Sequence, residues 1–519
     1  RSKKEILHET MSGDINSLGH QLNRFSERNR HFRDFTLYSL ISTIKEIIAC
    51  FPVYRTYVTA DEAVSDRDRR YITDAVRCAK TRAPGVPSMV FDFIAQLLLK
   101  ETRLSTREEC EERARFIGKF QQITSPVAAK GIEDTALYIY NRLLSLNEVG
   151  TDPTVFGLEP SAVHDWMVER RRRWPAALST TATHDTKRGE DARARLNVLS
   201  EIPGAWKAAI ARWRAVNRRF KSDFNNGARR LAPDANEEYL IYQTLVGAWP
   251  FAFTPPDGEA SFRERIGKFV VKALREAKVH SSWLNPDEEY EKAVLRFTAA
   301  LLDKKRGASF LHSFLPFQAR VAELGIYNSL AQLAVKVTAP GVPDFYRGTE
   351  FWDLNLVDPD NRRPVDFAAR RCALGRLTDA SDLTELLRHR ADGRVKLFVM
   401  TKALETRARL RNVFEQGDYV PLQTAGARKD CVFAFARTLP DGRAAMTCVP
   451  RLVASLLPDA ANPPIGAAIW SDTRIALPSG ARLRNIFTND ELTPENGDGG
   501  WTIPASAAFD RFPVAVLVH

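Results

Sequence analysis

The sequence has no long hydrophobic run and is poor in the residues that mark membrane or fibrous proteins. No stretch of its 519 residues approaches the roughly 18 uninterrupted apolar residues of a membrane-spanning helix. Its 27 glycines and 28 prolines are too few for a collagen-like or low-complexity chain. These absences exclude an integral membrane helix protein and a fibrous protein, and we expect a folded globular protein with no membrane partner.

Cysteine is also scarce, and its spacing excludes two kinds of site. The 6 cysteines are scattered, and no two of them form a Cys-x-x-Cys pair. A disulfide framework is unusual in a chain of this size, and the spacing typical of zinc sites is missing. We therefore expect reduced, mostly packed thiols in a cytoplasmic protein, with no metal site and no cofactor.

Motifs for nucleotide binding and for serine hydrolysis are missing as well. The sequence contains no Gly-x-Gly-x-x-Gly, no P-loop and no Gly-x-Ser-x-Gly. The net charge of +11 raises the possibility of nucleic acid as a partner, and the run from Arg170 to Trp174 combines basic and aromatic side chains. Acidic residues are interspersed and no nucleic-acid module is recognisable, so we expect a solvated helix face and no nucleic-acid partner.

Hydrophobic periodicity predicts a mostly helical chain with a few short strands and a β-rich end. Residues 35–48 carry apolar side chains at helical spacing, and the β-branched and aromatic run 53–58 predicts a strand after Pro52. A short apolar-to-polar run stands at 177–183, and residues 341–346 predict a short strand. From about residue 413, short β-rich runs alternate with turn residues, which favours an antiparallel β-domain.

The pair His184-Asp185 ends the apolar run 178–184 and opens a charged loop. In parallel α/β barrels, active sites lie at the carboxyl ends of the strands, so this position is a candidate for chemistry. Adjacent residues on a strand point to opposite faces, which argues against a metal site formed by this pair alone. Taken alone, the position is about equally typical of a buried structural aspartate.

Several segments together resemble one family. They are Ala-Lys-Gly-Ile-Glu-Asp-Thr-Ala at 129–136, Leu-Asn-Glu-Val-Gly at 146–150, Thr-His-Asp-Thr-Lys-Arg at 183–188, Gly-Val-Pro-Asp-Phe-Tyr-Arg-Gly-Thr-Glu at 341–350 and Asp-Pro-Asp-Asn-Arg-Arg-Pro at 358–364. In this order, they resemble the maltooligosyl trehalose synthases, glucan glucosylmutases of the α-amylase superfamily. The resemblance implies a retaining conversion of the reducing-end α-1,4 linkage of a maltooligosaccharide to an α,α-1,1 linkage, in trehalose biosynthesis.

The resemblance also implies an α/β fold and a division of the chain. We expect an incomplete (β/α)8 barrel, containing about strands six to eight at 53–58, 178–184 and 342–346, with large helical insertions and a C-terminal antiparallel β-domain. The expected ranges are 1–58 for a helix and the sixth barrel strand, 59–175 for a helical insertion with a substrate-binding segment at 129–150, 176–412 for the rest of the barrel with an insertion at 190–335, and 413–519 for the β-domain.

One departure from the family matters for activity. In the family, a carboxylate nucleophile follows the fourth barrel strand and a carboxylic acid follows the fifth, and we find neither motif in this sequence. We therefore expect a C-terminal portion whose partner is the missing N-terminal half of the barrel, and which is inactive alone. Two alternatives stay open, an amylase-type glycoside hydrolase and a non-catalytic binding module.

The resemblance assigns roles to particular residues. Asp185 is implied as the third carboxylate, which holds sugar hydroxyls beside the scissile bond. The other implied substrate-binding residues have the mixed donors and acceptors that sugars require: His184, Lys130, Glu133, Asp134, Arg142, Asn147, Glu148, Lys187, Arg188, Arg55, Tyr57, Tyr346 and Glu350.

Overall fold

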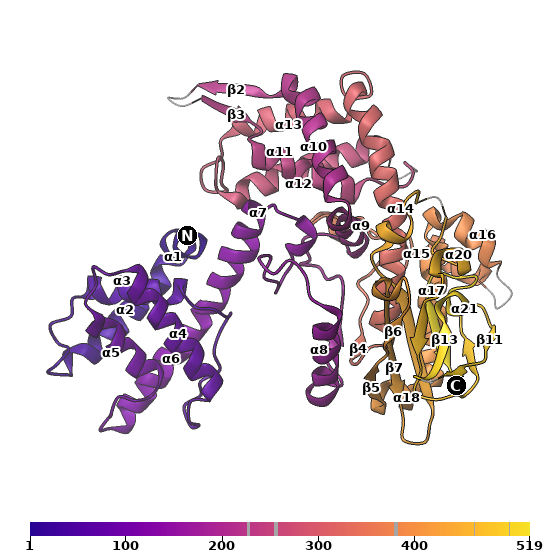
Figure 1. Ribbon diagram of the computed structural model, residues 1–519. Helices are drawn as coiled ribbons and strands as arrows, with labels where there is room; N and C mark the ends of the chain where they lie inside the picture. The colour runs from indigo at the N-terminus through magenta and orange to yellow at the C-terminus, as the bar shows by residue number, and fades with distance from the viewer. Residues whose placement is uncertain (226–228, 254–257, 378–381, 461, 498) are drawn as a thin grey trace. The chain divides into compact units, whose positions relative to one another are not determined.

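The computed structural model describes residues 1–225, 229–253, 258–377, 382–460, 462–497 and 499–519 (Figure 1). The chain divides into two compact units. The first unit contains Arg1–Tyr140 and Ala273–Pro286, and the second contains Asn141–Lys272 and Asp287–His519. The division into four ranges expected from the sequence stays a prediction. None of the described helices combines the length and the apolar character that a membrane span requires.

The first unit is helical, and its helices begin where the sequence provides caps. Thr36 and Ser65 accept backbone N–H groups at the starts of two helices, and Thr106 forms a capping box with Glu109 at the start of a third. Their apolar faces meet in one core that contains Phe93. The helices are α1 (Ser2–Glu9), α2 (Ser12–Glu27), α3 (Leu37–Ala49), α4 (Asp66–Arg82), α5 (Ser88–Leu98), α6 (Arg107–Ala128), the π-helix η1 (Ala129–Ala136) and α7 (Leu137–Ile139).

The strand expected at 53–58 is not formed, so that prediction is wrong. All residues of the first unit are described, and none of them belongs to a strand. The segment is extended, but its backbone is held by side chains: Val58 donates its N–H to Gln121 at 2.7 Å and accepts from the same amide at 3.1 Å. A β-branched run becomes a strand only where a second strand offers a partner, and this unit offers none.

The second unit contains a short parallel strand pair. Strand β1 (Leu178–Ser179) pairs with β4 (Val342–Pro343), as expected for neighbouring strands of a barrel. Both strands are shorter than the predicted ranges 178–184 and 342–346. Among the described residues, no further strand pairs with either of them, so the incomplete barrel stays a prediction.

Helices account for most of the chain between β1 and β4. Helix α9 (Glu190–Glu201) packs along the long α14 (Ala308–Thr338), which leads into β4. Helix α8 (Pro160–Arg173) precedes β1. The other helices between β1 and β4 include α10 (Pro203–Asn217), α11 (Ala235–Ala248), α12 (Glu259–Ala277) and α13 (Glu288–Leu302). Strands β2 (Ser222–Asn225) and β3 (Arg229–Ala232) form a hairpin in the same part of the chain.

After β4, short helices lead into two antiparallel sheets (Figure 1). The helices are η4 (Asp360–Arg362), α15 (Phe367–Arg376), α16 (Leu383–Arg388), α17 (Arg394–Arg409) and α18 (Arg411–Gln416). One sheet has the order β11-β10-β14-β8-β7-β5 and the other β12-β13-β9-β6. The strands are β5 (Asp418–Pro421), β6 (Thr424–Ala425), β7 (Val432–Thr438), β8 (Ala444–Pro450), β9 (Arg474–Ala476), β10 (Leu483–Asn485), β11 (Glu491–Leu492), β12 (Glu495–Gly497), β13 (Gly500–Pro504) and β14 (Ala515–Val518).

Candidate functional site

The loop 183–188 follows β1 and carries the candidate catalytic carboxylate. Asp185 is exposed, and its backbone N–H donates to the hydroxyl of Thr183 at 3.1 Å. The hydroxyl of Thr186 donates back to the carbonyl of Thr183 at 2.9 Å. These two bonds close a tight turn, so the Asp185 side chain projects from a backbone of defined shape.

Glu148 holds this loop in place through hydrogen bonds from the backbone of the loop. Its side chain is 6% exposed, and its two oxygens accept the backbone N–H of Lys187 at 2.9 and 3.1 Å. One of them also accepts the N–H of Val149 at 2.8 Å, and Arg193 lies 3.6 Å from the other. Charge-assisted bonds from backbone N–H groups are strong, so this buried carboxylate fixes the position of the loop.

Asn361 holds the other side of the loop. Its side-chain amide donates to the backbone carbonyl of His184 at 2.9 Å, and its backbone carbonyl accepts a hydrogen bond from the hydroxyl of Tyr346 at 3.2 Å. The neighbouring Asp360 pairs with Arg265 through two bonds of 2.7 and 2.8 Å. Burial alone would raise the pKa of Asp360, but the ion pair with Arg265 lowers it, so this carboxylate stays ionised.

A buried charge cluster lies where the loop enters α9. Lys396 is 0% exposed and donates to Glu190 and Asp191 at 2.7 Å each. Lys336 lies 3.5 Å from Glu190, and Asp353 accepts the backbone N–H of Glu190 at 3.4 Å. Five buried ionisable groups thus lie together here, and none of them is among the predicted site residues.

The pKa values within this cluster move in opposite directions. Burial works against ionisation of Glu190, but Lys396 and Lys336 outweigh it and lower the pKa of Glu190 to about 2. Burial and the charge of Asp191 raise the pKa of Asp353 to about 6. Glu190 is therefore the anion that the two lysines stabilise, whereas Asp353 takes up a proton in mildly acidic solution.

The remaining predicted residues of the second unit lie in varied surroundings. Lys187 and Arg188 are each 3% exposed, and Arg188 stacks on Phe269 with 5.8 Å between its guanidinium carbon and the ring centroid. Asn147 is buried. Arg142 is exposed and lies over Phe156 at 4.5 Å, and Glu350 pairs with Arg370 at 2.8 Å. The structure thus joins Glu148, Lys187, His184 and Tyr346 in one network with Asp185, whereas Arg142 and Glu350 have separate partners.

A second group of predicted residues lies in the first unit, on the π-helix η1. Lys130 pairs with Asp134 at 2.6 Å, and the buried Glu133 accepts a hydrogen bond from the hydroxyl of Tyr54. Gly131 allows this geometry, because a Cβ there would lie 2.9 Å from the backbone of Lys3. π-Helices are rare and occur frequently at functional sites, so this segment is a second candidate for sugar contacts.

Sequence reasoning missed two members of these groups. The first is Tyr54, which bonds Glu133. The residues predicted from the same segment, Arg55 and Tyr57, contact each other instead, with 4.7 Å between the Arg55 guanidinium carbon and the centroid of the Tyr57 ring. Asn361 belongs to a motif that supported the resemblance, but nothing in the sequence joins it to His184. Both contacts link residues far apart in the chain, and only the fold reveals them.

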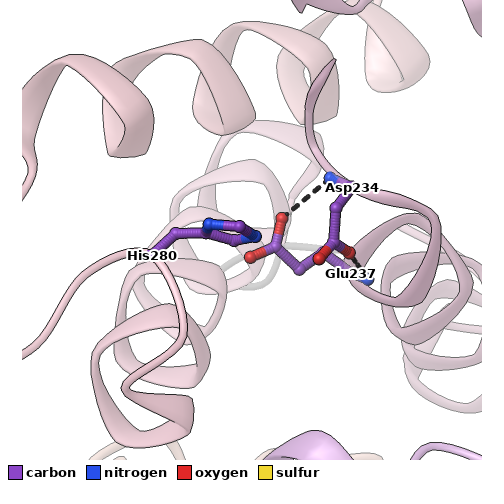
Figure 2. A group of neighbouring side chains, drawn as sticks. All are labelled: Asp234, Glu237 and His280. Atoms are coloured by element: carbon purple, nitrogen blue, oxygen red, sulfur yellow. Dashed lines mark hydrogen bonds between the residues drawn. The ribbon is translucent and has the colours of Figure 1, made fainter. Parts of the chain in front are cut away.

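Two carboxylates at the start of α11 have a structural role. Asp234 accepts the N–H of Glu237 at 2.8 Å and donates its own N–H to Glu237 at 2.9 Å, and Figure 2 shows both bonds. The hydroxyl of Tyr290 also donates to Glu237, and burial and that carboxylate raise the pKa of Tyr290, which keeps its proton. These bonds form a capping box at the start of α11.

A cavity beside β1 does not include the loop 183–188 in its lining. It has a volume of about 720 Å³ in the second unit, beside β1, and Trp166, Thr181, Lys336 and Phe433 are among its lining residues. Thr181 and Lys336 connect its wall to Glu190 of the charge cluster. Within the loop, His184 and Asp185 are exposed, whereas Thr186, Lys187 and Arg188 are buried.

Comparison with known proteins identifies relatives by sequence. The chain is 35% identical over 401 residues to a curated protein of Mycobacterium tuberculosis named maltooligosyl trehalose synthase, a match that covers 77% of this chain and 45% of the relative. No family model matches the chain. The chain therefore spans about half the length of the curated relatives it matches.

Solved structures show the same similarity. A maltooligosyltrehalose synthase from Arthrobacter ramosus is similar with a TM-score of 0.75 and 29% identity, covering 100% of this chain and 57% of that one. A hypothetical maltooligosyl trehalose synthase from Sulfolobus tokodaii is similar with a TM-score of 0.68 and 27% identity, again covering 57% of that chain. The resemblance inferred from the motifs is thus confirmed, and this chain is a homologue of the maltooligosyl trehalose synthases that matches about half of their length.

Proposed function

We propose that this chain is part of an intramolecular transglucosylase that converts the reducing-end α-1,4 linkage of a maltooligosaccharide to the α,α-1,1 linkage of a trehalose end. The observation that carries the proposal is the exposed Asp185 on a loop fixed by Glu148 and Asn361, after a strand of a parallel pair. Its position at the carboxyl end of β1 agrees with the position of active sites in barrels. The names of the homologues support the reaction class.

The proposed mechanism retains configuration at the reacting carbon. A carboxylate attacks the anomeric carbon and forms a covalent glycosyl intermediate, while a carboxylic acid protonates the leaving glucose. The glucose rotates and attacks the intermediate through its own anomeric hydroxyl, which gives its proton to the carboxylate that acted as acid. Asp185 holds hydroxyls of the sugar at the scissile bond and stabilises the charged, distorted ring, and exclusion of water prevents hydrolysis.

We further propose that the nucleophile and the acid come from polypeptide outside this chain. Two features of the second unit support a missing neighbour. Helix α8 has no buried residue, and Leu178 and Val342 of the parallel pair are 66% and 41% exposed. Interior residues of a complete barrel are covered by the other strands. The partner is therefore proposed to be the missing half of the barrel, and the isolated chain is proposed to be inactive.

The test compares the isolated chain with the chain joined to the additional segment that the relatives carry. With maltopentaose, we expect no change in reducing ends for the isolated chain and a loss of reducing ends for the joined one. A gain of reducing ends would instead indicate an amylase-type hydrolase. Unchanged reducing ends in both proteins, with steeply salt-dependent DNA binding, would indicate a binding module.

Asp185→Asn in the joined protein tests the role of this carboxylate. We expect turnover to fall by several powers of ten, because a contact made in the transition state is lost in a site that excludes water. The circular dichroism spectrum and the melting temperature should stay unchanged, because Asp185 is exposed. The matched control is Asp74→Asn, on an exposed helix position, which should leave turnover unchanged. A near-normal rate for Asp185→Asn would contradict the assigned role.

A further inference from the structure

Two cysteines of the first unit face each other. Cys50 ends α3 as its C-cap residue, and Cys78 lies in the last part of α4, which packs against α3. Their sulfur atoms are 2.8 Å apart. The sequence predicts scattered, unrelated thiols, so this pairing across 28 positions is a finding of the fold.

We propose that Cys50 and Cys78 form a modification site, which a small-molecule disulfide converts to a reversible disulfide that joins α3 to α4. A disulfide has a bond length of about 2.05 Å, so the two sulfur atoms need to approach by less than an ångström. The proposal does not depend on the proposed function.

The other cysteines offer no comparable pair. Cys110 and Cys372 are exposed, and Cys431 and Cys448 are buried in the second unit. Among the described residues, no hydrogen bond joins the sulfur of any of these four to another cysteine. Cys50 and Cys78 are both half-buried, so a small oxidant has access to them while the helices around them keep the two side chains facing each other.

The surroundings of Cys50 suggest the order of the steps. Burial and the neighbouring Cys78 raise the pKa of Cys50 to about 12, and Arg82 works in the opposite direction. The thiolate is the reacting form, so this raised pKa slows an attack by Cys50. In the proposed exchange, Cys78 attacks first and Cys50 second.

The reaction is a thiol–disulfide exchange with a low-molecular-weight disulfide, such as oxidised glutathione. The Cys78 thiolate attacks one sulfur of the oxidant, the oxidant's S–S bond breaks, and one glutathione leaves as a thiol. The Cys50 thiolate then attacks the sulfur of Cys78 and displaces the second glutathione. The protein loses two protons and two electrons, and the oxidant gains both.

The disulfide would close a chain segment that contains candidate sugar-binding residues. Between the two cysteines lie residues 51–65, which carry Tyr54, Arg55 and Tyr57 and form no helix or strand. The cross-link fixes both ends of this stretch through α3 and α4. Oxidation is therefore expected to restrain the segment that bonds Glu133.

The test treats the purified chain with oxidised glutathione and maps its thiols by peptide mass spectrometry. We expect a linked peptide pair that contains Cys50 and Cys78, lighter by two hydrogen atoms and split by dithiothreitol, together with slower amide exchange of residues 51–65. Cys50→Ser should remove the linked pair and leave a glutathione on Cys78. The matched control Cys372→Ser should keep the linked pair.

Two results would overturn the proposal. The first is glutathione attached only to the exposed Cys110 and Cys372, with Cys50 and Cys78 still free in the folded protein. The second is separate glutathione adducts on Cys50 and Cys78 with no bond between them. A linked pair with unchanged exchange of residues 51–65 would overturn the restraint of that segment. The wild-type measurement decides each outcome, so it does not depend on the folding of a variant.

Discussion

The loop 183–188 and the π-helix η1 present polar side chains in opposite ways. In the loop, buried side chains of Glu148 and Asn361 bond backbone groups, and Asp185 is left exposed. In η1, the side chains bond one another, as Lys130 bonds Asp134. Because buried side chains hold the backbone of the loop, the Asp185 carboxylate is left available to a ligand. In η1, the side chains pair with one another, so these pairs must break before the side chains can bind a sugar.

We expect the largest loss in the free energy of unfolding from a change at Lys396, which lies in the buried charge cluster where the loop enters α9. Lys396→Met removes the buried cation between Glu190 and Asp191, which leaves Asp191 without this cation and Glu190 with Lys336 alone. We expect a loss of about 3–5 kcal/mol in the free energy of unfolding, as for other broken buried ion pairs. Urea denaturation measures it.

The control for this change is Lys268→Met, because the side chain of Lys268 is 68% exposed and pairs with Glu264 on the same helix. An exposed pair of this kind is worth about 0–1 kcal/mol. Equal losses in the two variants would contradict the importance of the buried cluster.

The dependence of stability on pH tests the contribution of Asp353, a member of the buried charge cluster. Burial raises its pKa to about 6, so the folded state holds a proton that the unfolded state releases at about pH 4. The contribution of Asp353 to the free energy of unfolding is therefore expected to fall as pH rises from 4 to 6, by roughly 1–3 kcal/mol. Asp191, whose pKa is also raised by burial, acts in the same direction.

Asp353→Asn removes this titration, so the free energy of unfolding of the wild type relative to that of the variant should fall between pH 4 and pH 6. Urea denaturation at several pH values measures the difference. The control is Asp441→Asn, an exposed carboxylate whose pKa is lowered by Arg443 and which does not titrate in this window. Parallel curves for wild type and Asp353→Asn would show that Asp353 is ionised throughout.

The π-helix can be tested at Gly131. Gly131→Ala places a Cβ at 2.8 Å from the Lys3 side chain and 2.9 Å from its backbone, so α1 must move. Overpacking of this kind costs about 1–3 kcal/mol. Thermal unfolding measures the effect on the first unit. Gly118→Ala is the matched control, because nothing lies within 4 Å of its Cβ and alanine favours a helix, so its stability should rise slightly.

The smallest expected effect is at Glu148. Glu148→Gln keeps the size of the side chain but removes the charge that strengthens its bonds to the N–H groups of Lys187 and Val149. We expect a loss of about 1–2 kcal/mol and faster hydrogen exchange of the Lys187 amide. The exposed Glu111→Gln should leave both values nearly unchanged. Unchanged exchange at Lys187 in Glu148→Gln would remove Glu148 from the support of the loop.

Local patterns predicted the helices better than the strands. The apolar spacing of 35–48 gave a helix that the structure has at Leu37–Ala49, because a helix forms its backbone bonds within itself. The run 53–58 has strand-forming residues, but its hydrogen bonds go to the Gln121 side chain. A strand depends on a partner elsewhere, and local composition carries no information about that partner.

The candidate site was predictable only where a motif contained it. Asp185 and Glu148 belong to strings that resemble a family, so they could be named from the sequence. Lys396 lies 206 positions from Glu190, and a lysine in an ordinary helical stretch gives no sign that it is buried. Side chains that are distant in the sequence support the loop only because the fold packs them against it, and a local sequence pattern cannot predict such contacts.

The short pairing of β1 with β4 has a consequence for the order of assembly. These strands are two residues each, and their backbone bonds, such as that from Val342 to the carbonyl of Ala177 at 2.9 Å, join ends separated by several helices. Closing so long a loop for so few bonds is costly until the intervening helices have packed. We therefore expect this strand pair to form late in folding, after α9 and α14 have packed against each other, and the segment that presents Asp185 to reach its final position only then.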